Sequence, residues 1–116
     1  RLFKIVFVNK TNHYDTLFGG EAMSLMNEIA FITATRFSKK ICVTASSGHI
    51  EFKTPIPSGT IIEVAGKISR IGNTSLDVLV DVFIEEMYST KRTKAITGTF
   101  TLVTLDKENK PTNVLS

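Results

Sequence analysis

The chain has 116 residues, of which 42% are hydrophobic and 22% charged, and its formal net charge is +3. This length suits one hydrophobic core, so residues 1–116 are expected to form a single domain. No apolar run approaches the roughly 18 residues that span a bilayer, no signal peptide is visible, and the small charge excess forms no basic stripe typical of nucleic-acid binding.

The first predicted strand is the apolar run at residues 2–8. The next segment, residues 9–20, is rich in turn formers and closes with Gly19 and Gly20, which predicts a functional loop. Paired glycines are typical of a tight turn before a helix, and they also let the backbone approach a bound molecule closely. Both interpretations place the glycines at the entry to the next element.

A helix is predicted from Glu21 to about Phe37, because this segment contains no Gly or Pro. Its apolar residues occupy nearly the whole circumference, which is typical of a buried helix. The 3.6-residue period puts Asn27 on one face with the apolar residues Met23, Ala30 and Ala34. Asn27 is therefore an unexplained polar group on an apolar face.

Four further strands are predicted where β-branched residues alternate locally with polar ones, at residues 41–52, 60–71, 75–88 and 93–105. Turn formers separate these strands, at residues 55–59, 72–74, 89–92 and 106–111. Because short turns join consecutive strands and one helix is available, we expect an α+β fold whose antiparallel sheet wraps that helix. One helix cannot cover both faces, so a sheet face or edge should meet a second copy.

The sole cysteine, Cys42, has no intrachain partner, which excludes a disulfide framework and suits a reducing, cytoplasmic compartment. We expect it to be a buried core thiol. The two histidines, His13 and His49, lack the spacing of a metal site, and no serine motif completes a triad with either. Neither a metal nor a cofactor is therefore expected.

One family resemblance runs over almost the whole chain. The loop-and-helix signature of the hotdog acyl-CoA hydrolases is similar to NHYDTLFGG at residues 12–20 followed by MNE at residues 26–28. The likeness continues in register, at residues 52–56, 59–60, 72–76 and 95–100. Several matches in one order make the resemblance far more specific than any single motif.

The resemblance implies a hotdog fold, with a long helix wrapped by about five antiparallel strands, pairing into a double hotdog and assembling as a trimer of dimers. It implies an acyl-CoA substrate, bound at the dimer interface and hydrolysed to free fatty acid and CoA. The family's catalytic carboxylate falls on position 27 and its partner asparagine on Asn12, from facing subunits. The N–H groups at Gly19 and Gly20 would polarise the thioester carbonyl.

Position 27 departs from the family, because asparagine stands where the resemblance implies a catalytic aspartate. An aspartate could activate water or attack the thioester, whereas an amide is no base, and losing a general base typically costs about 10² to 10⁴ in rate. Asn27 is interpreted as a deliberate change in an active enzyme, as a natural feature of a weakened hydrolase, or as an interface amide without a chemical role. The predicted function is an acyl-CoA thioesterase impaired at position 27; the alternative is a catalytically silent acyl-CoA-binding or regulatory subunit.

The anionic phosphates of CoA make the turn after residue 71 and the basic clusters candidate contacts. The candidate side chains are Arg70, Asn73, Thr74, Ser75 and Arg92. The basic clusters are Lys39 with Lys40, residues 91–94, and Lys107 with Lys110. For Arg70 and Arg92 the alternative is an ordinary surface charge.

Overall fold

The computed structural model describes residues 2–5 and 19–115, including the side chains of Phe3 and of residues 21–115. The elements, in chain order, are β1 (Leu2–Ile5), α1 (Gly19–Ser38), β2 (Ile41–Phe52), β3 (Thr60–Ile71), β4 (Ser75–Glu86) and β5 (Arg92–Leu105). The predicted bounds of the helix and of the last four strands are confirmed to within two residues.

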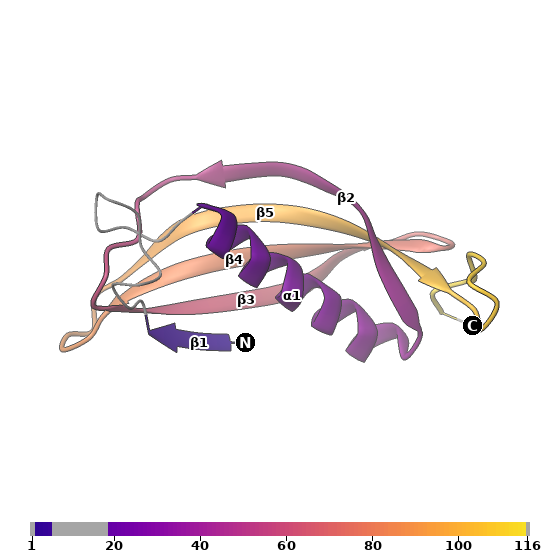
Figure 1. The fold of residues 1–116 in the computed structure, drawn as a ribbon, viewed down its shortest axis with the longest axis horizontal. Coiled ribbons are helices and arrows are strands. Elements are labelled where there is room, and N and C mark those ends of the chain that lie inside the picture. The colour runs from indigo at the N-terminus through magenta and orange to yellow at the C-terminus, as the bar shows by residue number, and fades with distance from the viewer. Residues whose placement is uncertain (1, 6–18, 116) are drawn as a thin grey trace.

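All five strands form one antiparallel sheet in the order β1-β3-β4-β5-β2. Helix α1 crosses one face of this sheet, and its length lies obliquely over the long strands (Figure 1). Strand β2 follows the helix in the chain but lies at the far edge of the sheet, beside β5. The predicted α+β arrangement of one long helix against an antiparallel sheet is confirmed.

The core lies between α1 and the sheet. In β4 every second residue is buried, because strand side chains alternate between the two faces, and these residues are Leu76, Val78, Val80, Val82 and Ile84. In β5 the alternation likewise buries Ile96, Phe100 and Leu102. The helix contributes Ala22, Leu25, Met26, Ile29, Ala30 and Ala34. Cys42 is buried as predicted, with its thiol 3.4 Å from Ser38 Oγ.

The expectation that α1 is buried on all sides is wrong for the single chain. The sheet covers only one side of the helix, so Phe31 and Ile32 on the other side remain 45% and 40% exposed. The first half of β2 is exposed in the same way, with Ile41 at 50% and Val43 at 44%. This apolar surface joins the outer side of α1 to the sheet edge.

The helix packs closely against β3 at Gly66. A methyl group added at Gly66 would lie 2.7 Å from Thr33 Oγ1 and 2.8 Å from Ile29 Cγ2, both on α1. Both distances are shorter than van der Waals contact, so only glycine fits without a shift of helix or strand. The absence of a side chain at this position therefore sets how closely the helix packs on the sheet.

Gly66→Ala should destabilise the chain by about 1 to 3 kcal/mol, because it overpacks the contact between α1 and β3. Urea unfolding followed by circular dichroism measures this loss. The second change Thr33→Ala removes the atom nearest to the new methyl group, so adding it to Gly66→Ala should cost less than it costs alone. Strictly additive effects would contradict the close approach.

Candidate functional site

The polar pair between Asn27 and Thr44 joins α1 to β2. Thr44 Oγ1 donates a hydrogen bond to Asn27 Oδ1 at 3.0 Å, and both residues are exposed in the single chain. This contact occupies the amide oxygen, while no described residue accepts a hydrogen bond from the amide nitrogen of Asn27. The Nδ2 group is therefore left to donate to a bound molecule.

Thr44 was missed in the sequence, although strand alternation puts it on the same face as the buried Cys42 and so toward the helix. The pairing of β2 with β5 is regular up to Thr44 and shifts register directly after it. Such bulges are frequent next to functional sites, where they redirect side chains. The alternation was a usable signal for Thr44, whereas the bulge depends on the pairing of distant strands.

Gly19 and Gly20 are the first two residues of α1 rather than the end of the preceding loop. Their N–H groups belong to the first turn, which has no carbonyl partners within the helix. Asn27 follows on the same helix, about 11 Å from Gly20 at 1.5 Å per residue. Asn12, the fourth predicted catalytic residue, lies outside the described residues.

The guanidinium of Arg70 is held by groups of its own chain. It donates to both carboxylate oxygens of Asp77, at 2.8 and 3.2 Å, and to Ser75 Oγ at 3.2 Å. This fork lowers the pKa of Asp77; a hydrogen bond from Thr101 also lowers it, against the opposing effect of burial. The same contact raises the pKa of Arg70.

The predicted CoA-binding turn is also tied into the fold through its backbone. Gly72 N–H donates to the carbonyl of Ser75 at 2.8 Å, which closes the turn. The carbonyl of Thr74 accepts from Thr104 N–H at 3.0 Å, and that of Asn73 from Val114 N–H at 2.8 Å. These bonds anchor the C-terminal segment, so the turn has an architectural role in addition to the binding role that remains a prediction.

Arg92 is separated from this turn by the length of β4. It pairs with the buried Glu63, lies 3.8 Å from Glu85, and stacks 3.8 Å from the centre of the Phe83 ring. Along β4, its neighbour Glu85 is roughly 33 Å from Ser75 at about 3.3 Å per residue. One chain therefore does not bring Arg92 together with Arg70, Asn73, Thr74 and Ser75.

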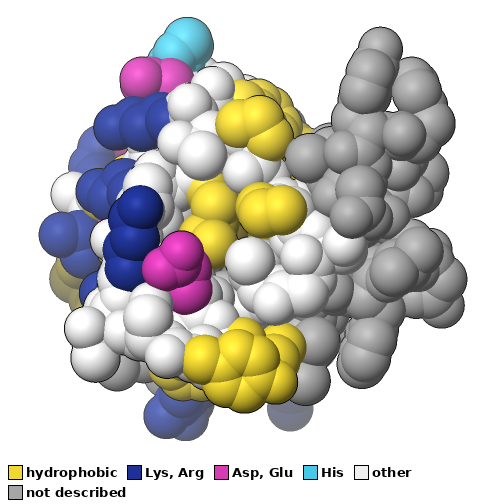
Figure 2. Space-filling model, turned by 90° about the vertical axis from the view of Figure 1, so that its left-hand side faces the viewer, with side chains coloured by type: hydrophobic (Ala, Val, Ile, Leu, Met, Phe, Trp, Pro, Cys, Tyr) yellow, Lys and Arg dark blue, Asp and Glu magenta, His cyan; other side chains and the backbone are white. Residues whose placement is uncertain are grey.

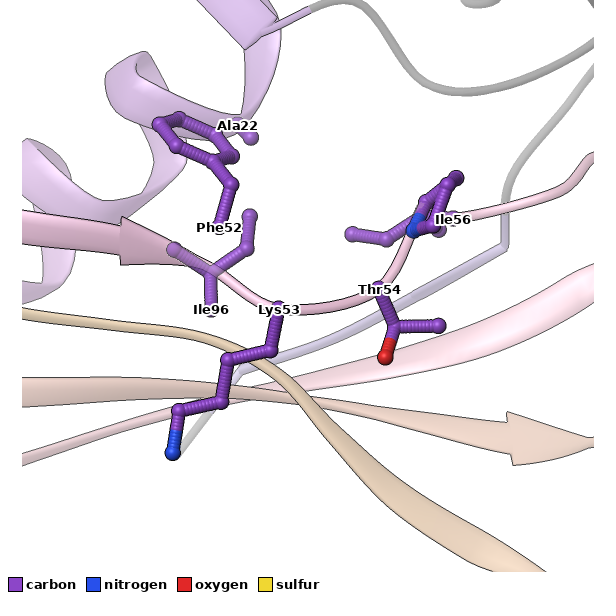
Figure 3. A pocket seen from close by; sticks show the side chains of 7 residues that line it. Ala22, Phe52, Lys53, Thr54, Ile56 and Ile96 are labelled. Carbon is purple, nitrogen blue, oxygen red and sulfur yellow. The ribbon is translucent and has the colours of Figure 1, made fainter.

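A cavity of about 230 Å³ opens beside the start of α1. Its lining is mostly apolar and consists of Ala22, Phe52, Lys53, Thr54, Pro55, Ile56 and Ile96. In Figure 3 the Phe52 ring lies beside Ala22, and the amine of Lys53 points away from the helix. On this end of the molecule hydrophobic side chains gather near the middle, with Lys and Arg along the left side (Figure 2).

Within residues 2–5 and 19–115, no group of three or more His, Cys, Asp or Glu side chains is placed to hold a metal ion. Over the same residues, no helix combines the length and the apolar character that crossing a membrane requires.

Comparison with known proteins gives a family match over most of the chain. The model of the family described as the thioesterase superfamily matches residues 14–91. A Bacillus subtilis relative described as the uncharacterised acyl-CoA thioester hydrolase YkhA is 36% identical over 109 residues, which cover 94% of this chain. The chain spans only 63% of the length of that relative.

Solved structures match with the same architecture. The Staphylococcus aureus acyl-CoA hydrolase, in complex with butyryl-CoA, CoA and CoA disulfide, matches with a TM-score of 0.95 and 36% identity. The match covers 99% of this chain and 70% of that one. Variants of that enzyme with one aspartate, threonine or asparagine changed to alanine match with TM-scores of 0.95, 0.95 and 0.94. A hexameric acyl-CoA thioesterase without ligand matches with a TM-score of 0.95 and 32% identity, over 98% of this chain and 73% of that one.

Asp77 gives a prediction for stability in acid. Because the Arg70 hydrogen bond lowers the pKa of Asp77, the Asp77 carboxylate binds a proton less tightly in the folded chain than in the unfolded chain. Its contribution to stability is therefore complete above the ordinary pKa of aspartate and is lost as the pH falls through the lower, folded-state pKa. Asp77→Asn should reduce the drop in melting temperature between about pH 6 and about pH 3.

The matched variant Arg70→Gln removes the hydrogen bond that lowers this pKa, so it should flatten the same pH profile. If the melting temperatures of both variants fall in acid as steeply as that of the parent chain, the Arg70–Asp77 pair does not contribute to this pH dependence.

Proposed function

Because the chain belongs to the thioesterase superfamily and has the hotdog fold, we propose that its site is built to hydrolyse the thioester of an acyl-CoA. The products are a free acid and CoA. The observation that carries this proposal is the polar pair of Asn27 and Thr44, which joins α1 to β2.

The spacing of polar residues supports position 27 as the catalytic position. Asn12, Asn27 and Thr44 follow one another with the same separations as the substituted asparagine, aspartate and threonine of the Staphylococcus aureus enzyme. Two of the three residue types agree, and the third differs only by an amide in place of a carboxylate. We infer that Asn27 stands at the position of a catalytic aspartate.

An aspartate at this position would have two oxygens with different tasks. One would accept the hydrogen bond from Thr44, which orients the carboxylate, and the other would take a proton from water or attack the thioester carbon. Asn27 keeps the first contact but presents an NH₂ donor in place of the second oxygen. The site therefore binds an acyl-CoA and turns it over slowly.

The start of α1 supplies the complementary half of the chemistry. Backbone N–H groups at Gly19 and Gly20, together with the positive end of the helix dipole, stabilise the negative charge that develops on the thioester oxygen. Asn12 orients the attacking water or the carbonyl from a facing subunit. The apolar cavity beside Ala22 and Ile96 receives the first carbons of the acyl group.

A second copy of the chain completes the site. The exposed apolar side chains of α1 and the free edge of β2 form one continuous surface, which suits antiparallel pairing of two β2 strands about a two-fold axis. Three such dimers give the trimer of dimers, an assembly supported by the hexameric relative. Asn27 itself favours the second candidate function, a catalytically silent acyl-CoA-binding subunit, because it leaves the cleft without a base.

Asn27→Asp should raise the rate of acyl-CoA hydrolysis by about 10² to 10⁴, because it restores the base or nucleophile. Release of the CoA thiol, followed with a thiol-reactive dye under saturating substrate, measures kcat.

Asn27→Ala serves as the control, since it changes the same position without adding a carboxylate. If the aspartate variant binds CoA but hydrolyses acyl-CoA no faster than the parent, the catalytic assignment is wrong and the binding-subunit function is supported.

Thr44→Val should lower kcat of the Asn27→Asp enzyme about tenfold and leave KM nearly unchanged. The substitution keeps the shape of the side chain but removes the hydroxyl that orients residue 27, so Thr44 acts as a positioning residue. Thr44→Ser, which retains the hydroxyl, should preserve most of the rate. An equal loss in both variants would indicate a packing role instead.

A further inference from the structure

The end of the molecule at which α1 stops carries an excess of positive charge. Five cationic residues lie on α1, the α1–β2 link and the turn after β5, against the two carboxylates of Asp106 and Glu108. They are Arg36, Lys39, Lys40, Lys107 and Lys110. The fold joins two basic clusters that are far apart in the sequence, at the right-hand end of the molecule in Figure 1.

Two cavities open on either side of this α1–β2 link. The first, of about 510 Å³, lies between α1 and β2 and is lined by Phe31, Thr35, Arg36, Lys39, Lys40, Ile41 and Cys42. The second, of about 380 Å³, lies between the link and the end of β5 and is lined by Lys39, Lys40, Ile41, Leu105, Asp106, Lys107 and Thr112. Lys39 and Lys40 line both cavities.

Most of these cations are not used to stabilise the fold. The last helical carbonyls are capped by other groups, since Ser38 Oγ donates to Ala34 O at 2.9 Å and Lys39 N–H donates to Thr35 O at 2.8 Å. Lys40 Nζ donates to the carbonyl of Asn113. No carboxylate of the described residues pairs with Arg36, Lys39 or Lys107.

The carboxylate of Asp106, which lines the second cavity, takes part in its own turn. Asp106 Oδ1 accepts hydrogen bonds from the backbone N–H groups of Glu108 and Lys110, at 2.8 and 3.0 Å. Cations gathered around one cavity repel one another unless an anion lies between them. The arrangement of charges therefore suits a bound anion with more than one negative charge.

The first cavity connects this cluster with the candidate active site. Phe31 and Thr35 follow Asn27 by one and two helical turns, and Cys42 precedes Thr44 on the same face of β2. Lys39 lies about 18 Å from Asn27 along the helix at 1.5 Å per residue. Between them, Thr35 Oγ1 is buried without a hydrogen-bond partner in the described chain, so it is available to an amide of a bound molecule.

We propose that the cluster of Lys39, Lys40 and Lys107, flanked by Arg36, binds the phosphate groups of CoA, while the pantetheine arm lies along α1 toward residue 27. This inference rests on the proposed function. Lysine ammonium groups bind phosphate as point charges, and an arginine can add a bidentate contact. Arg70 and Arg92 are less suited to this task, because Asp77 and Glu63 already bind their guanidinium groups.

Calorimetric titration of the parent chain tests this proposal, because binding is measured without turnover. Lys39→Ala combined with Lys107→Ala should raise the Kd for CoA about tenfold, because two ammonium groups that attract the phosphates are lost. The Kd for pantetheine, which carries no phosphate, should stay the same. Binding of CoA to the double variant should also depend less steeply on salt.

The matched control is Lys67→Glu, which changes the net charge by the same two units at an exposed lysine elsewhere on the chain. It should leave the Kd for CoA unchanged, and melting temperatures should show that both variants fold. If the Lys39 and Lys107 variant keeps the parent's Kd for CoA, or if the control loses as much affinity for CoA, the phosphate assignment is wrong. Neither result contradicts the proposed function. A parent chain that binds no CoA overturns the proposed function as well.

Discussion

A single helix has to cover one face of a five-stranded sheet, and the position of every other feature depends on how it does so. Gly66 lets α1 approach β3 closely, which packs Ile29 and its neighbours onto the core strands. The opposite side of the helix and the edge strand β2 are then left exposed. This unpartnered boundary is where the polar pair of Asn27 and Thr44 lies.

The location of that pair explains why an amide is tolerated at position 27. Asn27 lies at the border between the packed and exposed sides of α1, so its amide needs no hydrogen-bond partner from the core. Thr44 satisfies its oxygen and leaves its nitrogen available. A carboxylate at position 27 would have nearly the same shape as this amide, so the packing around the position accommodates either group.

The cations of the sheet and the cations where α1 ends have different surroundings. Arg70, Arg92 and Lys94 all lie close to carboxylates of other strands, and Arg92 also covers the ring of Phe83. These contacts hold strands together. The cations where α1 ends are largely without such partners, which distinguishes charges that stabilise the fold from charges available to a ligand.

The sequence alone determined the order and bounds of the long elements, because helix periodicity, strand alternation and turn formers are local properties of the chain. It also singled out Asn27, since a polar residue among Met23, Ala30 and Ala34 stands out in a helical pattern. Only the tertiary structure decided which side of α1 is covered, which carboxylates hold Arg70 and Arg92, and that Lys39 meets Lys107. These contacts join residues far apart in the chain, and they depend on strand order and register, which no local pattern specifies.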